Sequence, residues 1–250
     1  MELQQMSSPC EARQVFTAVC VEDPLGCYRD MNEAVVKIKF QIRASQATFQ
    51  YYEDNLATYQ ENLIHYPESR IRAQQLIDKT KAALYLCIHP TGDPNEDTVQ
   101  EIVALQRSLD LQCQNAPQFL DFAESAVQPG MHREGIFRGY CVVTLMTKVP
   151  GFRVPYTTFC GWSPAQRDEM REAFKKALLE VWKCGIRPND CALRNIVWDE
   201  RERKCYIVDF EDSQLFDPER TPLPKFDEFE FRLWGIDEER AALLYKDKLG

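Results

Sequence analysis

The sequence predicts an α+β protein with a β-rich first part, a long helical insertion and a helical second part. Three observations predict this class. Residues 14–22 and 34–42 are rich in β-branched and apolar residues, as expected of strands. The stretch from Ala44 to about His89 contains no glycine and places apolar residues at helical spacing. Residues 163–183 open with Ser-Pro and carry an apolar stripe along one helical face.

The other elements follow from local signals. Pro67, in the segment HYPES, divides the glycine-free stretch into two helices, which indicates a helical hairpin. A further helix is expected after the loop HPTGDPNED, in the segment EIVALQRSLDLQ. The segments QFLDFAES, YCVVTLMTKV, NIVWD and CYIVDF are typical of strands. The expected organisation is a small lobe over residues 1–148, with its insertion at about 44–96, and a reduced helical lobe over 149–250.

Composition narrows the class of protein. No apolar run approaches the roughly 20 residues that a membrane span needs, and the N-terminus lacks a signal-peptide core, so a cytoplasmic protein without a membrane partner is expected. The ten cysteines form no CxxC pair and the three histidines are scattered, which favours reduced thiols and no structural zinc. The net charge of −9 disfavours a general nucleic-acid coat, although local basic faces remain open.

The segment DCALRNIVWDERERKCYIVDFEDS carries the strongest chemical pattern. Asp190 stands five residues before Asn195, and a strand, a turn and a second strand then lead to Asp209. Any one of these residues alone would be interpreted as a turn former. Together they resemble the catalytic loop and metal-binding segment of the protein-kinase-like fold, which includes small-molecule phosphotransferases. The resemblance implies that Asp190 acts on the attacking group and that Asn195 and Asp209 hold magnesium against phosphates.

Upstream segments extend this resemblance to about residues 14–43 and 97–213. AVVKIKF resembles the strand whose lysine pairs with nucleotide phosphates, which would be Lys37, with Lys39 on the same strand face as a second possibility. EIVALQRSL resembles the helix whose glutamate pairs with that lysine, which would be Glu101. Glu53 and Glu61 are rival partners if the first inserted helix takes that place.

Several departures separate the chain from ordinary protein kinases. There is no glycine before Gly26, so the strands preceding Lys37 lack a glycine-rich loop through which backbone N–H groups approach phosphates. The metal segment reads Asp-Phe-Glu, with Glu211 where protein kinases have glycine. About 40 residues follow Asp209, too few for a protein-substrate platform.

Three functions stay open on this basis. The first choice is a tRNA-dependent cyclodipeptide synthase, because DCALRN and the chain's size resemble the arginine-containing cyclodipeptide synthases of fungi. That resemblance implies arginyl-tRNA and a second aminoacyl-tRNA as substrates, a diketopiperazine product, no cofactor, and Asp190 as the base. The alternatives are an ATP- and magnesium-dependent small-molecule phosphotransferase, with metal on Asn195 and Asp209, and a pseudokinase binding module. No stable protein partner is implied.

The cyclodipeptide synthase interpretation also implies residues that bind the guanidinium group and the tRNA. A carboxylate pocket for a guanidinium group would draw on acidic residues near Asp209, and Arg194 is a further substrate-binding candidate; the acidic candidates are Glu211, Asp212, Asp227, Glu228 and Glu230. Basic residues of two helical segments would meet the tRNA backbone; they are Arg70, Arg72, Lys79, Lys81, Lys175 and Lys176. Solvated helix faces and a solvated acidic tail are the simpler interpretations of the two sets.

Overall fold

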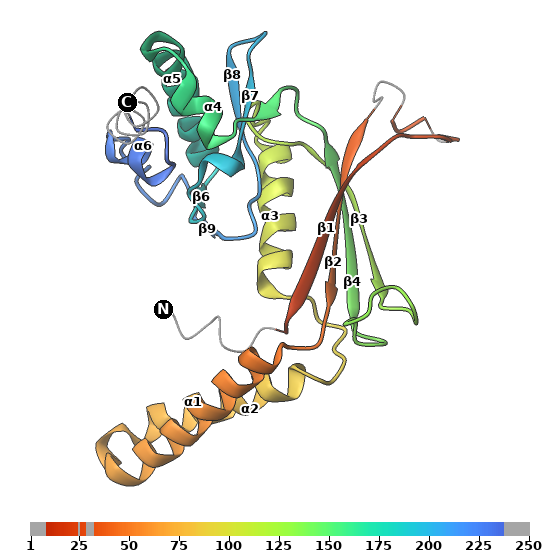
Figure 1. Cartoon of the computed structure of the whole chain (residues 1–250), viewed down its shortest axis with the longest axis vertical. Helices are drawn as coiled ribbons and strands as arrows, with labels where there is room; N and C mark the ends of the chain where they lie inside the picture. The colour runs from red at the N-terminus through yellow and green to blue at the C-terminus, as the bar shows by residue number, and fades with distance from the viewer. Residues whose placement is uncertain (1–8, 25, 29–32, 238–250) are drawn as a thin grey trace. The chain divides into compact units, whose positions relative to one another are not determined.

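A computed structural model describes residues 9–24, 26–28 and 33–237, and it confirms the α+β class (Figure 1). Two strands come first in the chain, and the helical insertion follows them. The elements are β1 (Glu11–Ala18), β2 (Ala34–Gln41), α1 (Gln46–His65), α2 (Arg70–Leu86), α3 (Glu96–Asp110), β3 (Phe119–Ala126), β4 (Tyr140–Thr147), β5 (Phe152–Arg153), α4 (Tyr156–Gly161), α5 (Pro164–Lys183), β6 (Ile186–Pro188), β7 (Ile196–Asp199), β8 (Lys204–Ile207), β9 (Ser213–Leu215) and α6 (Phe229–Leu233).

The strands form three sheets. The largest has the order β1-β2-β4-β3, so the predicted strands of the first part lie in one sheet. Strands β5, β7 and β8 form a second, antiparallel sheet, and β6 pairs antiparallel with β9. The pairing of β7 with β8 confirms the short hairpin that NIVWD and CYIVDF predict.

The chain forms two compact units that interleave along the sequence. The described residues of the first fall within 1–16, 36–99 and 122–144, and those of the second within 17–35, 100–121 and 145–237. This division does not follow the expected one at residue 148, and the two expected lobes stay a prediction. None of the described helices is long and apolar enough to cross a membrane.

The first unit contains the helical hairpin (Figure 1). The side chain of Ser45 accepts a hydrogen bond from the Thr48 N–H at 3.1 Å, which caps the start of α1. A short 3₁₀ turn, Pro67–Ser69, separates α1 from α2 at the predicted break. Tyr52, Ala83 and Cys87 form the buried seam between the two helices. The insertion expected at about 44–96 is therefore a hairpin whose apolar positions face each other.

A buried glutamine joins the hairpin to the sheet within this unit. The Gln41 side chain is fully buried, and its Nε2 donates to the carbonyls of Leu86 at 3.1 Å and His89 at 2.9 Å. Its Oε1 accepts from the Thr91 N–H at 2.9 Å. All three bonds satisfy polar groups that water does not reach, so they fix the chain where it leaves α2.

The second unit is built around α5. Ser163 and Gln166 form a capping box at its start, with Pro164 as the first helical residue. The predicted apolar stripe is buried, including Met170 and Phe174. The Phe174 ring lies 5.1 Å from the Trp234 ring, measured between centroids, which secures the segment after α6 against the helix. The core around α5 supports the loop that carries Asp190.

Gly185 lies in the turn between α5 and β6, and we expect Gly185→Ala to destabilise the second unit. Its φ is +69°, and a Cβ there would lie 2.2 Å from the Phe216 carbonyl oxygen. Left-handed backbone costs a non-glycine residue about 1 to 2 kcal/mol before any clash. The free energy of unfolding, measured by urea titration, should fall by at least about 2 kcal/mol. Gly161→Ala is the matched control, because a Cβ added at Gly161 would meet no atom within 4 Å; equal stability of both variants would contradict the expectation.

Candidate functional site

The segment after β6 is tied to the segment that follows Asp209. The Asn189 N–H donates to the Asp212 carbonyl oxygen at 2.9 Å, and Asn189 Nδ2 donates to Asp212 Oδ1 at 3.0 Å. Antiparallel pairing of Pro188 with Ser213 continues this connection. The chain on either side of Asp190 and Asp209 is thus held at a fixed spacing by backbone and side-chain bonds.

Asp190 and Asn195 form a hydrogen-bonded pair. Asn195 Nδ2 donates to the backbone carbonyl of Asp190 at 2.9 Å and to Asp190 Oδ2 at 2.9 Å. Arg194 Nη2 lies 2.5 Å from Asp190 Oδ1 and 2.7 Å from Oδ2. The Asn195 side chain is buried, whereas that of Asp190 is 34% exposed. The pair therefore presents an oriented carboxylate that a small molecule can reach.

Asn195 Nδ2 donates both side-chain hydrogen bonds to Asp190, so Oδ1 is the remaining polar atom of the Asn195 amide. Its backbone carbonyl accepts from the Val208 N–H at 3.0 Å, so the pair lies next to the residue that precedes Asp209. The predicted relation of Asp190, Asn195 and Asp209 thus corresponds to one connected piece of structure.

Asp209 has an unusual backbone conformation. Its φ is +70°, a region that L-residues with a side chain adopt at a cost, although aspartate and asparagine tolerate it better than most. The next residue, Phe210, is fully buried and anchors the segment in the core. Strained backbone of this kind persists where surrounding structure holds it, often at functional sites.

Three carboxylates gather around Asp209. One carboxylate oxygen from each of Glu101, Asp209 and Glu211 lies within 4.8 Å of the others. Glu101 comes from α3 and is buried, while Asp209 and Glu211 follow β8 and are half-buried. We call this group the acidic cluster. The sequence pattern pairs Glu101 with Lys37 and links Glu211 to a guanidinium pocket; the structure places both glutamates with Asp209.

The donor chemistry of the acidic cluster suits a divalent cation. Two negative charges about 5 Å apart repel each other by about 3 kcal/mol at an effective dielectric constant of about 20. A positive charge among the three carboxylates, from a side chain or an ion, offsets this repulsion. Magnesium prefers hard oxygen ligands, and carboxylates are the usual protein donors to it. The carboxylates of Glu101, Asp209 and Glu211 fit such an ion.

The lysine and glutamate candidates of the first unit are placed as follows. Lys37 and Lys39 are both buried in β2, and Lys39 Nζ lies 3.6 Å from Glu11 Oε1. Glu53 and Glu61 are exposed on α1. The pairing of Lys37 with Glu101 stays a prediction.

The basic candidates for tRNA binding lie in both units. Arg70, Arg72 and Lys81 are exposed on α2, and Lys79 is half-buried there. On α5, Lys176 is exposed, whereas Lys175 Nζ lies 5.2 Å from the centre of the Phe226 ring. Two further basic residues of α5, Arg167 and Arg171, are buried, and Arg171 pairs with Asp168. Contact with tRNA stays a prediction for this set.

The acidic candidates for a guanidinium pocket do not share one set of contacts. Glu211 belongs to the acidic cluster, and Asp212 accepts from Asn189. Asp227 Oδ1 accepts from the Phe229 N–H at 2.7 Å at the start of α6. Glu230, on α6, lines a separate pocket. Glu228 is exposed. Arg194, the remaining substrate-binding candidate, pairs with Asp190.

Glu230 gives a pH-dependent prediction. Burial raises the pKa of this carboxyl above its ordinary value of 4.5, and the nearby Arg187 guanidinium opposes the rise. Because the pKa of Glu230 is higher in the folded protein than in the unfolded chain, the protonated carboxyl favours the folded state. This contribution to stability is complete below pH 4.5, and it is lost as the pH rises through the folded-state pKa. Glu230→Gln should therefore raise the melting temperature at pH 7 and change it less at pH 4, as measured by calorimetry.

The control for this prediction is Glu228→Gln, since the Glu228 side chain is exposed on the neighbouring turn. Equal shifts of the melting temperature at both pH values for Glu230→Gln would contradict the assigned cause.

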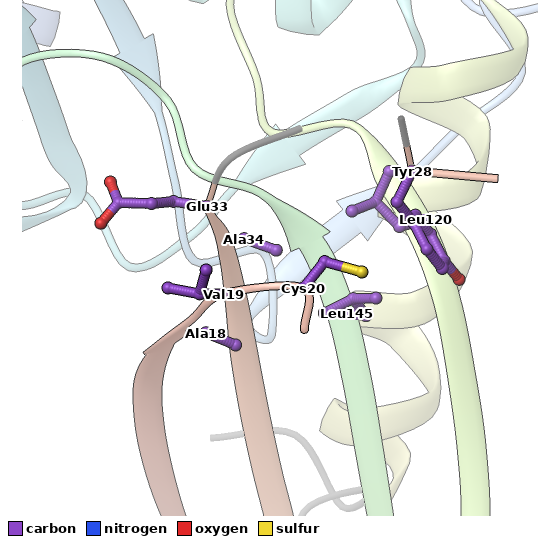
Figure 2. Close-up of a pocket in the computed structure, with 8 residues that line it drawn as sticks. All are labelled: Ala18, Val19, Cys20, Tyr28, Glu33, Ala34, Leu120 and Leu145. Carbon is purple, nitrogen blue, oxygen red and sulfur yellow. The ribbon is translucent and has the colours of Figure 1, made fainter. Parts of the chain in front are cut away.

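A separate apolar pocket lies at one end of the four-stranded sheet (Figure 2). It has a volume of about 190 Å³ and is lined mainly by Val19, Cys20, Leu120 and Leu145, with Tyr28 at one side. The carboxylate of Glu33 points away from Tyr28 and Leu120 in Figure 2, and it pairs with Lys148 at 2.7 Å. None of the predicted site residues lines this pocket.

Two parts of the site were missed from the sequence. The sequence pattern does not group Glu211 with Glu101, because only the folded chain brings α3 next to the segment after β8. Arg187, which acts on Glu230, lies between the buried residues Ile186 and Pro188 of β6, and this alternation is a sequence signal for an exposed side chain.

Comparison with known proteins adds little about the site. No protein-family model matches the chain. No curated protein matches it. Among solved structures it is similar to the Rv3197–erythromycin complex from Mycobacterium tuberculosis, with 12% identity and a TM-score of 0.42 over 83% of this chain and 45% of that one. It is also similar to the Cydia pomonella granulovirus kinase PK-1, with 14% identity and a TM-score of 0.34 over 65% of this chain and 66% of that one. The chain thus spans about half the length of the first of these two proteins.

Proposed function

We propose that the chain is a divergent kinase-like phosphotransferase that uses ATP and magnesium to phosphorylate a small molecule. Two observations support the proposal: Asp190 is an oriented, accessible carboxylate, and three further carboxylates form the acidic cluster. The Val208 N–H donates to the Asn195 carbonyl, which joins the Asp190 loop to the residue before Asp209. A pure scaffold has no need of a partly exposed carboxylate held by two donors, nor of three further carboxylates gathered within 4.8 Å.

Asp190 serves as the general base in this proposal. Its carboxylate accepts a proton from the hydroxyl or amine of the acceptor molecule, while Asn195 holds Oδ2 in place. Arg194 is exposed and neutralises the carboxylate between turnovers. Positioning contributes the larger part of catalysis in phosphoryl transfer, so the fixed spacing of residues 188–213 matters as much as basicity.

Glu101, Asp209 and Glu211 are the residues that would hold magnesium, together with Asn195 Oδ1. When bound, the ion supplies positive charge to phosphate oxygens. The added carboxylate of Glu211 suits a chain that lacks a glycine-rich phosphate loop, because tighter metal binding can retain the nucleotide through its phosphates.

The proposal is tested by adding ATP with and without magnesium to the purified chain. Ligand at about 100 times its Kd stabilises a protein by about 2.7 kcal/mol, so the melting temperature should rise by several degrees with MgATP. Excess EDTA should remove the rise, and slow ADP formation should accompany it. An unchanged melting temperature with MgATP, or the same rise in EDTA, would contradict the proposal.

The cyclodipeptide synthase interpretation of the sequence remains a prediction with its own test. Expression in a neutral host, followed by mass spectrometry of small molecules, would reveal an arginine-containing diketopiperazine. That product, found without any MgATP effect on the chain, would replace phosphoryl transfer as the function.

A further inference from the structure

A second pocket in the same unit combines opposite charges with apolar walls. It has a volume of about 420 Å³, within the range that suits a small ligand. Its polar lining includes Arg187 and Glu230, and Leu178, Trp182 and Leu233 are among its apolar walls. We call it the charged pocket. The loop residues on both sides of Asp190, Asn189 and Cys191, also line it.

The two charges come from different elements. Arg187 lies in β6, directly opposite Gln214 of β9, and its side chain is exposed. Glu230 lies in α6 and is half-buried. Burial raises the pKa of Glu230, and the positive charge of Arg187 and the side chain of Trp234 oppose that rise. Asp227 is a further charged group that acts on Glu230.

Opposite charges that line one pocket suit a ligand that carries both signs. A guanidinium binds a carboxylate with directional hydrogen bonds, and a half-buried carboxylate gains most from a cation that replaces lost water. The apolar walls add affinity for a hydrocarbon side chain in proportion to the area they cover.

We propose that the charged pocket binds a free amino acid with a large apolar side chain. The ammonium group faces Glu230, the carboxylate faces Arg187, and the side chain packs against Trp182, Leu178 and Leu233. Leu233 is 44% exposed and offers most of this apolar surface, whereas Trp182 and Leu178 are almost fully buried and form the rigid base of the pocket. The inference does not depend on phosphoryl transfer, because binding is measured without nucleotide.

Three probes separate the contributions of the charges. L-Phenylalanine carries both charged groups, phenethylamine lacks the carboxylate, and 3-phenylpropionate lacks the ammonium. By calorimetric titration at pH 7, we expect L-phenylalanine to bind at least about 10-fold more tightly than either partial molecule, which corresponds to about 1.4 kcal/mol. Equal or weaker binding of L-phenylalanine would overturn the proposal.

Two variants assign each charge to its partner. Arg187→Gln should weaken L-phenylalanine and 3-phenylpropionate but leave phenethylamine unchanged. Glu230→Gln should weaken L-phenylalanine and phenethylamine but leave 3-phenylpropionate unchanged. Both side chains lie at the pocket lining outside the core, and the melting temperature checks that each variant folds. If both variants bind all three probes as the wild type does, the ligand does not occupy this pocket and the proposal fails.

Discussion

Asp190→Asn is expected to lower the rate of ATP-dependent turnover by about 100- to 10 000-fold, the range that a positioned general base contributes. The substitution keeps the shape of the side chain, so the fold should persist. It removes the negative charge and leaves one acceptor oxygen for the donors Asn195 Nδ2 and Arg194 Nη2, so it removes the base and costs on the order of 1 kcal/mol of stability. The rate is measured as ADP formation with saturating MgATP.

Asp110→Asn is the control for this variant, since Asp110 is an exposed aspartate at the end of α3, away from the described hydrogen bonds of the site. Its turnover should equal that of the wild type. Full turnover by Asp190→Asn, with an unchanged melting temperature, would reduce Asp190 to a turn residue.

Asp209→Asn is expected to abolish the magnesium-dependent part of ATP binding. Asparagine tolerates the φ of +70° as aspartate does, so stability should change little, while one carboxylate of the acidic cluster is lost. Calorimetric titration of ATP with magnesium should show Kd rising toward the value measured in EDTA. Retained magnesium-dependent binding would exclude Asp209 as a ligand.

Asp209→Ala distinguishes the effect of the residue on backbone stability from the effect of its carboxylate on MgATP binding. Alanine at a positive φ lacks the local hydrogen bonding that aspartate and asparagine offer, so this variant should be about 1 kcal/mol less stable than Asp209→Asn in urea unfolding. Both variants should bind MgATP equally poorly. Equal stability of the two would show that the backbone conformation at Asp209 does not depend on its side chain.

Local patterns in the sequence predict most of the elements. The apolar stripe of α5 and its Ser-Pro start predict its length, and Pro67 predicts where the helical hairpin divides. Such signals act over a few residues, and they need no knowledge of the rest of the chain. Local signals do not predict how the two compact units interleave along the chain, because this depends on pairing between strands far apart in sequence.

In the candidate site, too, the sequence predicts the local features but not the long-range ones. The spacing of Asp190 and Asn195 predicts a shared loop, because five residues can form one turn between two strands. The gathering of Glu101 with Asp209 and Glu211 joins residues more than 100 positions apart, and only the packing of α3 brings them together. Glu230 and Arg187 likewise meet through α6 and β6, so the sequence alone predicts only an acidic tail around Glu230.

Titration of Mn²⁺ followed by electron paramagnetic resonance tests the central claim most directly, because this ion substitutes for magnesium and its free form is counted in solution. The wild type should bind Mn²⁺ saturably, and more tightly with ATP present. Glu211→Gln should weaken that binding about 10-fold or more, because it removes one charged ligand from the acidic cluster. Glu219→Gln, at an exposed position, should bind as the wild type does. Identical Mn²⁺ binding by both variants would contradict the assignment of the acidic cluster as the metal site.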